Sequence, residues 1–282
     1  MDDQRYDRQL SFFGAAGQHV IRKTRVTIVG CGGLGSHIAQ QLSYLGIPTV
    51  ALVDADRVEW SNLNRLIGAV PADAREHRLK VRVLERTILS VLPDATVQAI
   101  PTTACDKRVF DAISRSDVVF GCVDNDAARL VLTHACSVYG VPYFDTASDI
   151  VDGEYGGRVM VSLDGDSCLV CLGEPDQTDL RLGFSTAQDL VIDQRIYGVD
   201  RRLLAGGGPS VVSINGVVAS LAVTEFIVWR TGLRLPKRLI RYHGRECRIG
   251  ESVDEPFANC YYCKDLYGNR DPHTLDQFLI PE

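Results

Sequence analysis

A glycine-rich segment holds the first residues whose types and spacing could do chemistry. Gly30, Gly32 and Gly35 have the spacing G-x-G-x-x-G, with Gly33 between them, and they follow an apolar run. Glycine permits a tight turn and lets a phosphate approach the next helix, whose free N–H groups and dipole favour anions. Asp54 ends a second apolar run, where an acid can accept hydrogen bonds from a ribose. The pattern predicts a nucleotide site and leaves NAD, FAD, SAM and ATP open.

Polar residues farther along the chain suit the phosphates of such a nucleotide. Asp56 follows the ribose acid closely, and Asn62, Asn64 and Arg65 come next in the segment SNLNR. The arginine offers forked donors to a polyphosphate. Lys80, in the following predicted helix, has the length to reach the β- and γ-phosphates. A polar surface loop and a solvated helix face are the alternative explanations for these residues.

Asp124 comes directly after the predicted fourth strand. A carboxylate at the carboxyl end of a parallel strand faces the crevice in which ligands bind. Magnesium prefers one or two carboxylates together with substrate phosphates, so Asp124 is a candidate magnesium ligand. The alternative is that it caps the next helix, but Asn125 or Asp126 can also do this.

Two pairs of cysteines indicate a separate metal site. Cys168 and Cys171 form one C-x-x-C motif, and Cys260 and Cys263 form another much later in the chain. Four thiolates suit a tetrahedral structural zinc ion, which would tie the C-terminal part to the middle of the chain. A redox dithiol is the alternative for either pair.

The elements that must position these residues alternate between strand and helix, which predicts parallel βαβ units with right-handed crossovers. The fold class is α/β: a Rossmann-like, doubly wound, mainly parallel sheet with an added antiparallel segment and a structural zinc knuckle pair. A hairpin is expected at residues 153–163 and an irregular polar segment at 174–208, and the tail from residue 264 has no clear pattern. The expected strands are 26–29, 50–53, 96–100, 116–122 and 142–145, and the expected helices are 4–22, 33–45, 73–92, 107–114, 127–139 and 209–229.

Composition narrows the class of protein. The chain has 282 residues and a formal net charge of −6, which disfavours nucleic acid as the main partner. No signal peptide is evident at the start of the sequence. The apolar stretch at residues 211–229 contains polar side chains, so we interpret it as a buried helix and not a membrane span. Nine cysteines without a secretion signal point to a reducing compartment, and we expect a cytoplasmic protein.

In combination and in order, these motifs resemble the adenylating enzymes of the ThiF/MoeB/HesA superfamily, which activate ubiquitin-like and sulfur-carrier proteins. The resemblance runs from about Arg5 to Cys263. The motifs that carry it are RYDRQ at the N-terminus, GCGGLG, DAD, SNLNR, the lysine at position 80, CVDN and the two C-x-x-C pairs.

The resemblance implies a reaction. ATP-Mg²⁺ would bind at the glycine loop, and the C-terminal carboxylate of a carrier ending in Gly-Gly would attack the α-phosphate to give an acyl-adenylate and pyrophosphate. Asp54 would bind the ribose, Asn62, Arg65 and Lys80 the phosphates, and Asp124 the Mg²⁺. Arg8 would reach the triphosphate of the neighbouring subunit in a homodimer. The whole chain, 1–282, would be one adenylation domain, with an N-terminal arm (1–24), a nucleotide-binding core (25–150) and a part for zinc, crossover loop and carrier binding (151–282).

The chain departs from the family pattern in three ways. Leu66 stands where Gln is common, and His77 stands where Gly is common. Members that form a thioester carry its cysteine after the first C-x-x-C, but residues 172–208 contain no cysteine. The remaining thiols are Cys31, Cys105, Cys122, Cys136 and Cys247. We therefore expect the enzyme to stop at the adenylate and pass it to a sulfur donor or to the cysteine of a conjugating enzyme.

Three alternatives compete with this function. One is a non-catalytic scaffold with a degenerate nucleotide site, which the intact set of charged positions disfavours. An NAD(P)-dependent oxidoreductase explains the glycine loop and Asp54 but gives no role to Arg65, Lys80, Asp124 or the cysteines. An adenylating dehydratase of a modified tRNA nucleoside shares the fold, but the acidic charge balance and the paired cysteine motifs disfavour it. The residues at 174–208 are the expected place for carrier selection, because loops on a rigid scaffold usually carry recognition.

Overall fold

The computed structural model describes residues 3–151, 153–173, 209–252, 257, 259–266 and 268–279. The segment expected to select the carrier, 174–208, lies outside the described residues, so that prediction remains untested.

One eight-stranded sheet forms the centre of the described structure, in the order β3-β2-β1-β4-β5-β6-β7-β8. The first five strands in this order pair in parallel, and β5 to β8 pair antiparallel. The expected α/β fold with an added antiparallel segment is confirmed. The parallel strands are β1 (Arg25–Val29), β2 (Thr49–Val53), β3 (Thr96–Ile100), β4 (Val118–Gly121) and β5 (Tyr143–Val151), and the others are β6 (Glu154–Ser162), β7 (Leu239–His243) and β8 (Arg248–Glu251).

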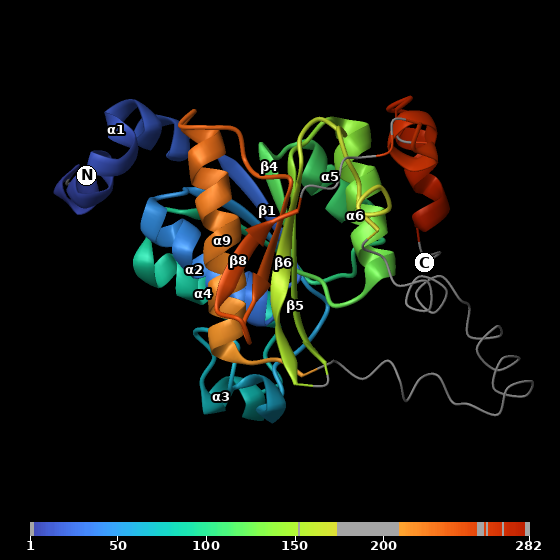
Figure 1. The fold of residues 1–282 in the computed structure, drawn as a ribbon. Helices are drawn as coiled ribbons and strands as arrows, with labels where there is room; N and C mark the ends of the chain where they lie inside the picture. The colour runs from blue at the N-terminus through green and yellow to red at the C-terminus, as the bar shows by residue number, and fades with distance from the viewer. Residues whose placement is uncertain are drawn as a thin grey trace, which may run out of the picture.

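Helices cover both faces of the sheet (Figure 1). One apolar core joins the sheet to α2, α4 and α9, and a second core joins its other face to α5, α6 and the cysteine region. β1 is buried on both faces, as expected of a central parallel strand. The α-helices are α1 (Asp7–Ile21), α2 (Gly33–Leu45), α3 (Pro71–Arg75), α4 (Lys80–Val91), α5 (Lys107–Ser114), α6 (Asp126–Tyr139) and α9 (Val212–Arg230); shorter turns are η1 (Asp3–Tyr6), η2 (Trp60–Asn62), η4 (Tyr261–Leu266) and η5 (Pro272–Phe278).

Three expectations about the elements are wrong. The helix expected at 73–92 is two helices, α3 and α4, separated at His77, whose φ of 47° is incompatible with a right-handed helix. The hairpin expected at 153–163 is formed by β5 and β6, because β5 continues past its predicted end at residue 145 to Val151. The tail expected to lack a pattern contains η4 and η5.

Among the described residues, the helix α9 is long and apolar enough to cross a membrane by length and composition. Half of its most apolar window is buried within the fold, where it packs on α2, β5 and β6. These contacts fit the helix expected to be buried in the core.

Candidate functional site

The glycine loop lies between β1 and α2, and close contacts explain two of its glycines. Gly30 has a φ of 95°, and a Cβ there would collide with the carbonyl oxygen of Cys122. A Cβ on Gly35 would collide with the carbonyl oxygen of Gly30. These two positions therefore hold the loop against β4 and fold it tightly.

The other two glycines of the loop face different surroundings. A Cβ on Gly32 would meet nothing within 4 Å, so this position borders open space at the start of α2. Gly33 faces inward, and a Cβ there would collide with the side-chain amide of Asn215 at the start of α9. Gly32 is thus the position at which a ligand can approach the backbone of the helix N-terminus most closely.

Asp54 joins the glycine loop to the end of β2. Its carboxylate accepts hydrogen bonds from the backbone N–H of Cys31 at 2.7 Å and of Asp56 at 2.7 Å. Each carboxylate oxygen keeps a second lone pair, so these bonds do not prevent Asp54 from accepting a ribose hydroxyl. Burial raises the pKa of Asp54, while Lys80 and the two N–H bonds oppose that rise.

Lys80 begins α4 and lies near Asp54, at the carboxyl ends of the parallel strands. This end of the sheet is called the carboxyl edge. Its backbone N–H donates to the carbonyl of Asp56 at 3.0 Å, and its ammonium donates to the Asp56 carboxylate at 2.7 Å. Its side chain is 13% exposed. Burial disfavours the charged form, but Asp54, Asp56 and Asp124 outweigh this effect and raise the pKa of Lys80. The site therefore holds a positive charge among three carboxylates before any ligand binds.

The SNLNR segment is folded by its own side chains. Asn62 accepts the N–H of Glu59 at 3.0 Å, and the guanidinium of Arg65 donates to the carbonyl of Ser61 at 2.5 Å and to Asn64 at 3.1 Å. The next residue, Leu66, is buried in the core. A hydrogen bond from Ile67 N–H to the hydroxyl of Ser36 holds the segment against the first turn of α2.

Asp124 follows β4 and is exposed. It does not cap α6, because the side chain of Asn125 does so by accepting the N–H of Ala128 at 2.8 Å. The cap alternative for Asp124 is therefore removed, and its carboxylate remains available at the carboxyl edge of the sheet.

Arg8 lies at the end of the molecule opposite the glycine loop. The helix α1 packs on the C-terminal end of α2, where Gln9 and Gln18 donate to the carbonyl of Leu45. The glycine loop precedes the N-terminal end of α2, and a helix of 13 residues is about 20 Å long. The exposed side chain of Arg8 is thus far from the candidate site of its own chain.

A buried ionic cluster beneath the loop after β4 was missed by sequence reasoning. It consists of Arg129, Asp145, Arg158 and Tyr143, and all four residues are at most 9% exposed. One signal was present: an arginine within an otherwise apolar helical stretch needs a buried partner.

The four cysteines of the two C-x-x-C motifs come together, buried, on the face of the sheet that carries α5 and α6. Their sulfur atoms all lie within 4.8 Å of one another, with pairs at 3.6 Å (Cys168–Cys171), 3.8 Å (Cys168–Cys260) and 3.2 Å (Cys171–Cys263). Tetrahedral zinc with Zn–S bonds of 2.3 Å separates its sulfur ligands by about 3.8 Å. The donor set and its spacing fit such an ion.

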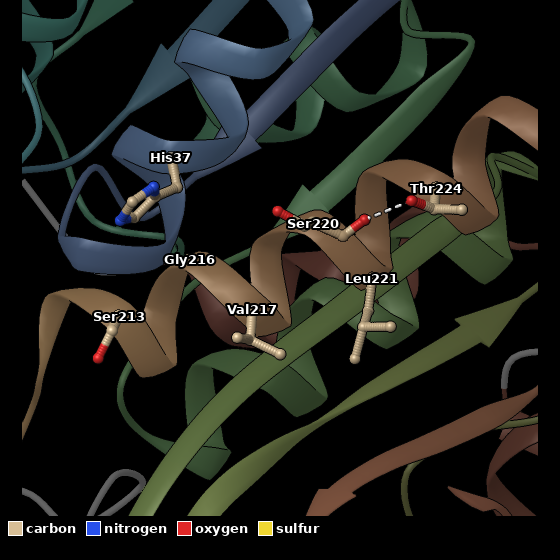
Figure 2. A pocket seen from close by; sticks show the side chains of 7 residues that line it. All are labelled: His37, Ser213, Gly216, Val217, Ser220, Leu221 and Thr224. Atoms are coloured by element: carbon tan, nitrogen blue, oxygen red, sulfur yellow. Dashed lines mark hydrogen bonds between the residues drawn. The ribbon is translucent and has the colours of Figure 1, made fainter. Parts of the chain in front are cut away.

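A surface pocket lies elsewhere, between α2 and α9 (Figure 2). Its volume is about 530 Å³, and it contains none of the residues expected at the nucleotide site. The imidazole of His37 is already bonded to the carbonyl of Val212 at 3.1 Å. Its lining residues are His37, Ser213, Gly216, Val217, Ser220, Leu221 and Thr224.

The sheet order and the charged residues at the carboxyl ends of its parallel strands define a doubly wound α/β protein, which also carries a cluster of four cysteines. The chain belongs to the ThiF family, whose match covers residues 6–277. The family expected from the sequence is therefore confirmed.

The named relatives support the expected class of enzyme. The sulfur carrier protein ThiS adenylyltransferase of Escherichia coli (strain K12) is 33% identical over 276 residues, 96% of this chain and 98% of that protein. The molybdopterin-synthase adenylyltransferase of the same organism is 27% identical over 263 residues, 92% of this chain and 95% of that protein. The chain spans about half the length of some other curated relatives.

Solved structures share the fold. The crystal structure of E. coli MccB with ATP has a TM-score of 0.71 and 21% identity, and the similarity covers 93% of this chain and 75% of that one.

Proposed function

We propose that this protein uses ATP to adenylate the C-terminal carboxylate of a small sulfur-carrier or ubiquitin-like protein that ends in Gly-Gly. The products are an acyl-adenylate and pyrophosphate. One observation carries the proposal: Lys80 is anchored by Asp56 at the same edge of the sheet as the open Gly32. A cation beside a helix N-terminus suits a triphosphate, which carries more negative charge than the pyrophosphate of a dinucleotide.

Each residue at this edge has a role in the proposal. Gly30, Gly32, Gly33 and Gly35 form the cradle for the nucleotide, and Asp54 binds the ribose. Asn62, Asn64 and Arg65 contact the phosphates, with Asp56 holding Lys80 in place. Arginine and lysine neutralise the charge that develops on oxygen during nucleotidyl transfer. Asp124 would hold Mg²⁺, which supplies further neutralisation of the triphosphate when bound.

ATP–pyrophosphate exchange with candidate carriers tests the reaction. Exchange that requires the carrier's terminal Gly-Gly is expected, and Arg65→Ala should reduce it strongly. Neither guanidinium bond of Arg65 leaves its own segment, so the substitution leaves the rest of the site intact. Exchange that persists in both Arg65→Ala and Asp124→Ala would sink the proposed site.

The position of Arg8 supports a homodimer in which the arm of one subunit completes the site of the other. Mixing inactive Arg8→Ala and Asp124→Ala proteins tests this. Random exchange of subunits between the two dimers would restore intact sites, to about one quarter of the total. A mixture as inactive as its components would show that Arg8 acts within its own chain or not at all.

We further propose that the four cysteines bind structural Zn²⁺. They leave no open position for a substrate, and a closed set of four thiolates is typical of structural sites. Metal analysis of the purified protein should give about one zinc ion per chain, and a Cys260→Ser variant should lose it.

Finally, the adenylate is expected to pass to a separate nucleophile. Burial raises the pKa of Cys31, Cys105, Cys122 and Cys136, to about 12 for Cys122, which disfavours their thiolates. Cys247 is exposed in the turn between β7 and β8. A thiol-labile carrier–enzyme adduct that forms with ATP and disappears on mutation of Cys105 or Cys247 would refute this part of the proposal.

A further inference from the structure

Asp124 must point toward Mg²⁺ if it holds the ion as the proposed function, on which this inference rests, requires. The carboxylate of Asp124 is exposed, and its contact with the side-chain amide of Asn125 is long, at 3.4 Å. Such a contact does little to fix a side chain. The orientation of Asp124 therefore depends on how firmly the backbone on each side of it is held.

Arg129 contacts the chain on both sides of Asp124, through a backbone carbonyl before it and a side-chain carboxylate after it. Its guanidinium donates to the carbonyl of Val123, directly before Asp124, and pairs with the carboxylate of Asp126 at 3.4 Å. The same group donates to both carboxylate oxygens of Asp145, each at 2.9 Å, and to the carbonyl of Thr146 at 2.7 Å. One side chain thus ties the loop that carries Asp124 to β5.

Burial makes these contacts of Arg129 costly to break. Arg129 is 5% exposed and Asp145 is fully buried. A buried guanidinium that loses a hydrogen-bonding partner leaves uncompensated charge in a low-dielectric interior, which is unfavourable. The loop after β4 consequently cannot move away without breaking the buried contacts of Arg129.

The same strand also supports the glycine loop. The hydroxyl of Thr146 donates to the carbonyl of Gly121 at 2.9 Å, next to Cys122, whose own carbonyl contacts Gly30. Contacts with β5 and with the glycine loop thus hold the backbone that leads to Asp124.

We propose that Arg129, anchored by Asp145, is a positioning residue that orients Asp124 toward the magnesium ion of bound ATP. Residues that orient a metal ligand from behind tune metal affinity strongly without touching the metal. The role differs from general support of the fold, because it predicts a change in the magnesium dependence of ATP binding.

Arg158 provides a matched control. It pairs with the same Asp145 carboxylate at 2.5 Å and is also buried, but it approaches from β6, on the side of β5 away from β4. Arg129→Lys and Arg158→Lys each keep a positive charge and remove a guanidinium that donates to Asp145. They differ in that Arg129→Lys also loses the forked link to the loop.

The test measures ATP binding to the full-length protein by calorimetry over a range of Mg²⁺ concentrations, without any carrier. Arg129→Lys should raise the Mg²⁺ concentration that gives half-maximal ATP binding by about 10-fold. Arg158→Lys should change it by less than about 2-fold, since its anchor lies away from Asp124. Thermal melts establish that both variants fold. If Arg129→Lys does not fold, Asp126→Asn replaces it, because that variant weakens the contact between Arg129 and the loop.

Equal Mg²⁺ dependence in the two lysine variants, or no change in either, would overturn the inference and leave the cluster a structural one. The outcome is separable from that of the proposed function. A protein that binds ATP in a Mg²⁺-dependent way but catalyses no exchange with any carrier contradicts the proposed function and still tests Arg129. A protein that binds no ATP, or binds it without regard to Mg²⁺, overturns the inference itself.

Discussion

The carboxyl edge of the sheet and the cysteine cluster are held together by different means. At the edge, polar groups satisfy one another: Lys80 bonds to Asp56, and Asp54 accepts two backbone N–H groups. At the cluster, the four buried sulfur atoms contact one another, and segments far apart in the chain supply them. The first region is preformed by the protein, whereas the second is the site at which we propose a structural Zn²⁺. Loss of a ligand should therefore affect the fold at the cluster and only the activity at the edge.

The largest expected effect is on stability at the cluster. Cys260→Ser should lower the free energy of unfolding by about 4 kcal/mol or more, because loss of a structural metal is among the few large destabilising changes. Urea denaturation with and without a chelator measures it. Cys136→Ala is the control, since Cys136 is also a buried thiol but lies in α6 outside the cluster. A wild-type protein indifferent to the chelator would show that both regions are preformed.

Lys80→Met should greatly lower the rate of ATP–pyrophosphate exchange and hardly change the stability of the fold. Loss of a positioned cation at a developing charge typically costs about 100- to 1000-fold in rate. Its partner Asp56 is 68% exposed and can return to water, so the melting temperature should hardly change. ATP–pyrophosphate exchange and a thermal melt give both quantities. A large drop in melting temperature would mean that the edge depends on Lys80 for its structure.

Two glycines of the loop allow the same contrast, between an effect on stability and an effect on ATP binding, to be tested within the carboxyl edge. Gly35→Ala should cost about 2 kcal/mol of stability, because its Cβ meets the carbonyl of Gly30 and the backbone must shift. The Cβ of Gly32→Ala would meet no atom of the described residues within 4 Å, so this variant should cost less than about 1 kcal/mol. It should weaken ATP binding about 10-fold if the phosphate approaches there. Equal effects of the two substitutions on ATP binding would argue against the close approach at Gly32.

The sequence predicts the local helices and strands and the cysteine cluster better than the long-range strand pairs and the buried ionic cluster, for a physical reason. Residues 33–45, 96–100 and 107–114 form helices and a strand with the predicted bounds, because local apolar periodicity and turn residues determine them. The extension of β5 and the strands β7 and β8 depend on cross-strand pairs between distant segments, which leave a weak local pattern. The cysteine motifs predicted the cluster only because metal ligands have a recognisable spacing.

The pairing within the buried ionic cluster could not be predicted from the sequence. Arg129 and Asp145 come from different elements, and nothing in the spacing pairs one with the other. The break between α3 and α4 was missed for a similar reason: a histidine gives no signal for a left-handed backbone conformation, although the family commonly has glycine at that position.

The break between α3 and α4 gives the prediction with the smallest expected effect. His77 follows the C-terminus of α3 with a φ of 47°, and the next residue, Arg78, donates its N–H to the carbonyl of Asp73 at 2.9 Å. This is the helix-ending geometry in which glycine is favoured. His77→Gly should raise the free energy of unfolding by about 0.5–1 kcal/mol, since relief of the left-handed strain exceeds the added entropy of the unfolded chain. Urea denaturation measures the change.

The matched control is His77→Ala, which keeps the Cβ and its strain. It should give no gain, because the side chain of His77 is exposed and its backbone carbonyl, which accepts Arg57 at 2.9 Å, is retained in both variants. ATP binding should be unchanged in His77→Gly if the bonds between Asp56 and Lys80 hold the start of α4 by themselves. A stabilised variant with weakened ATP binding would instead show that the strained turn helps to position Lys80, and that the edge is less self-sufficient than its hydrogen bonds indicate.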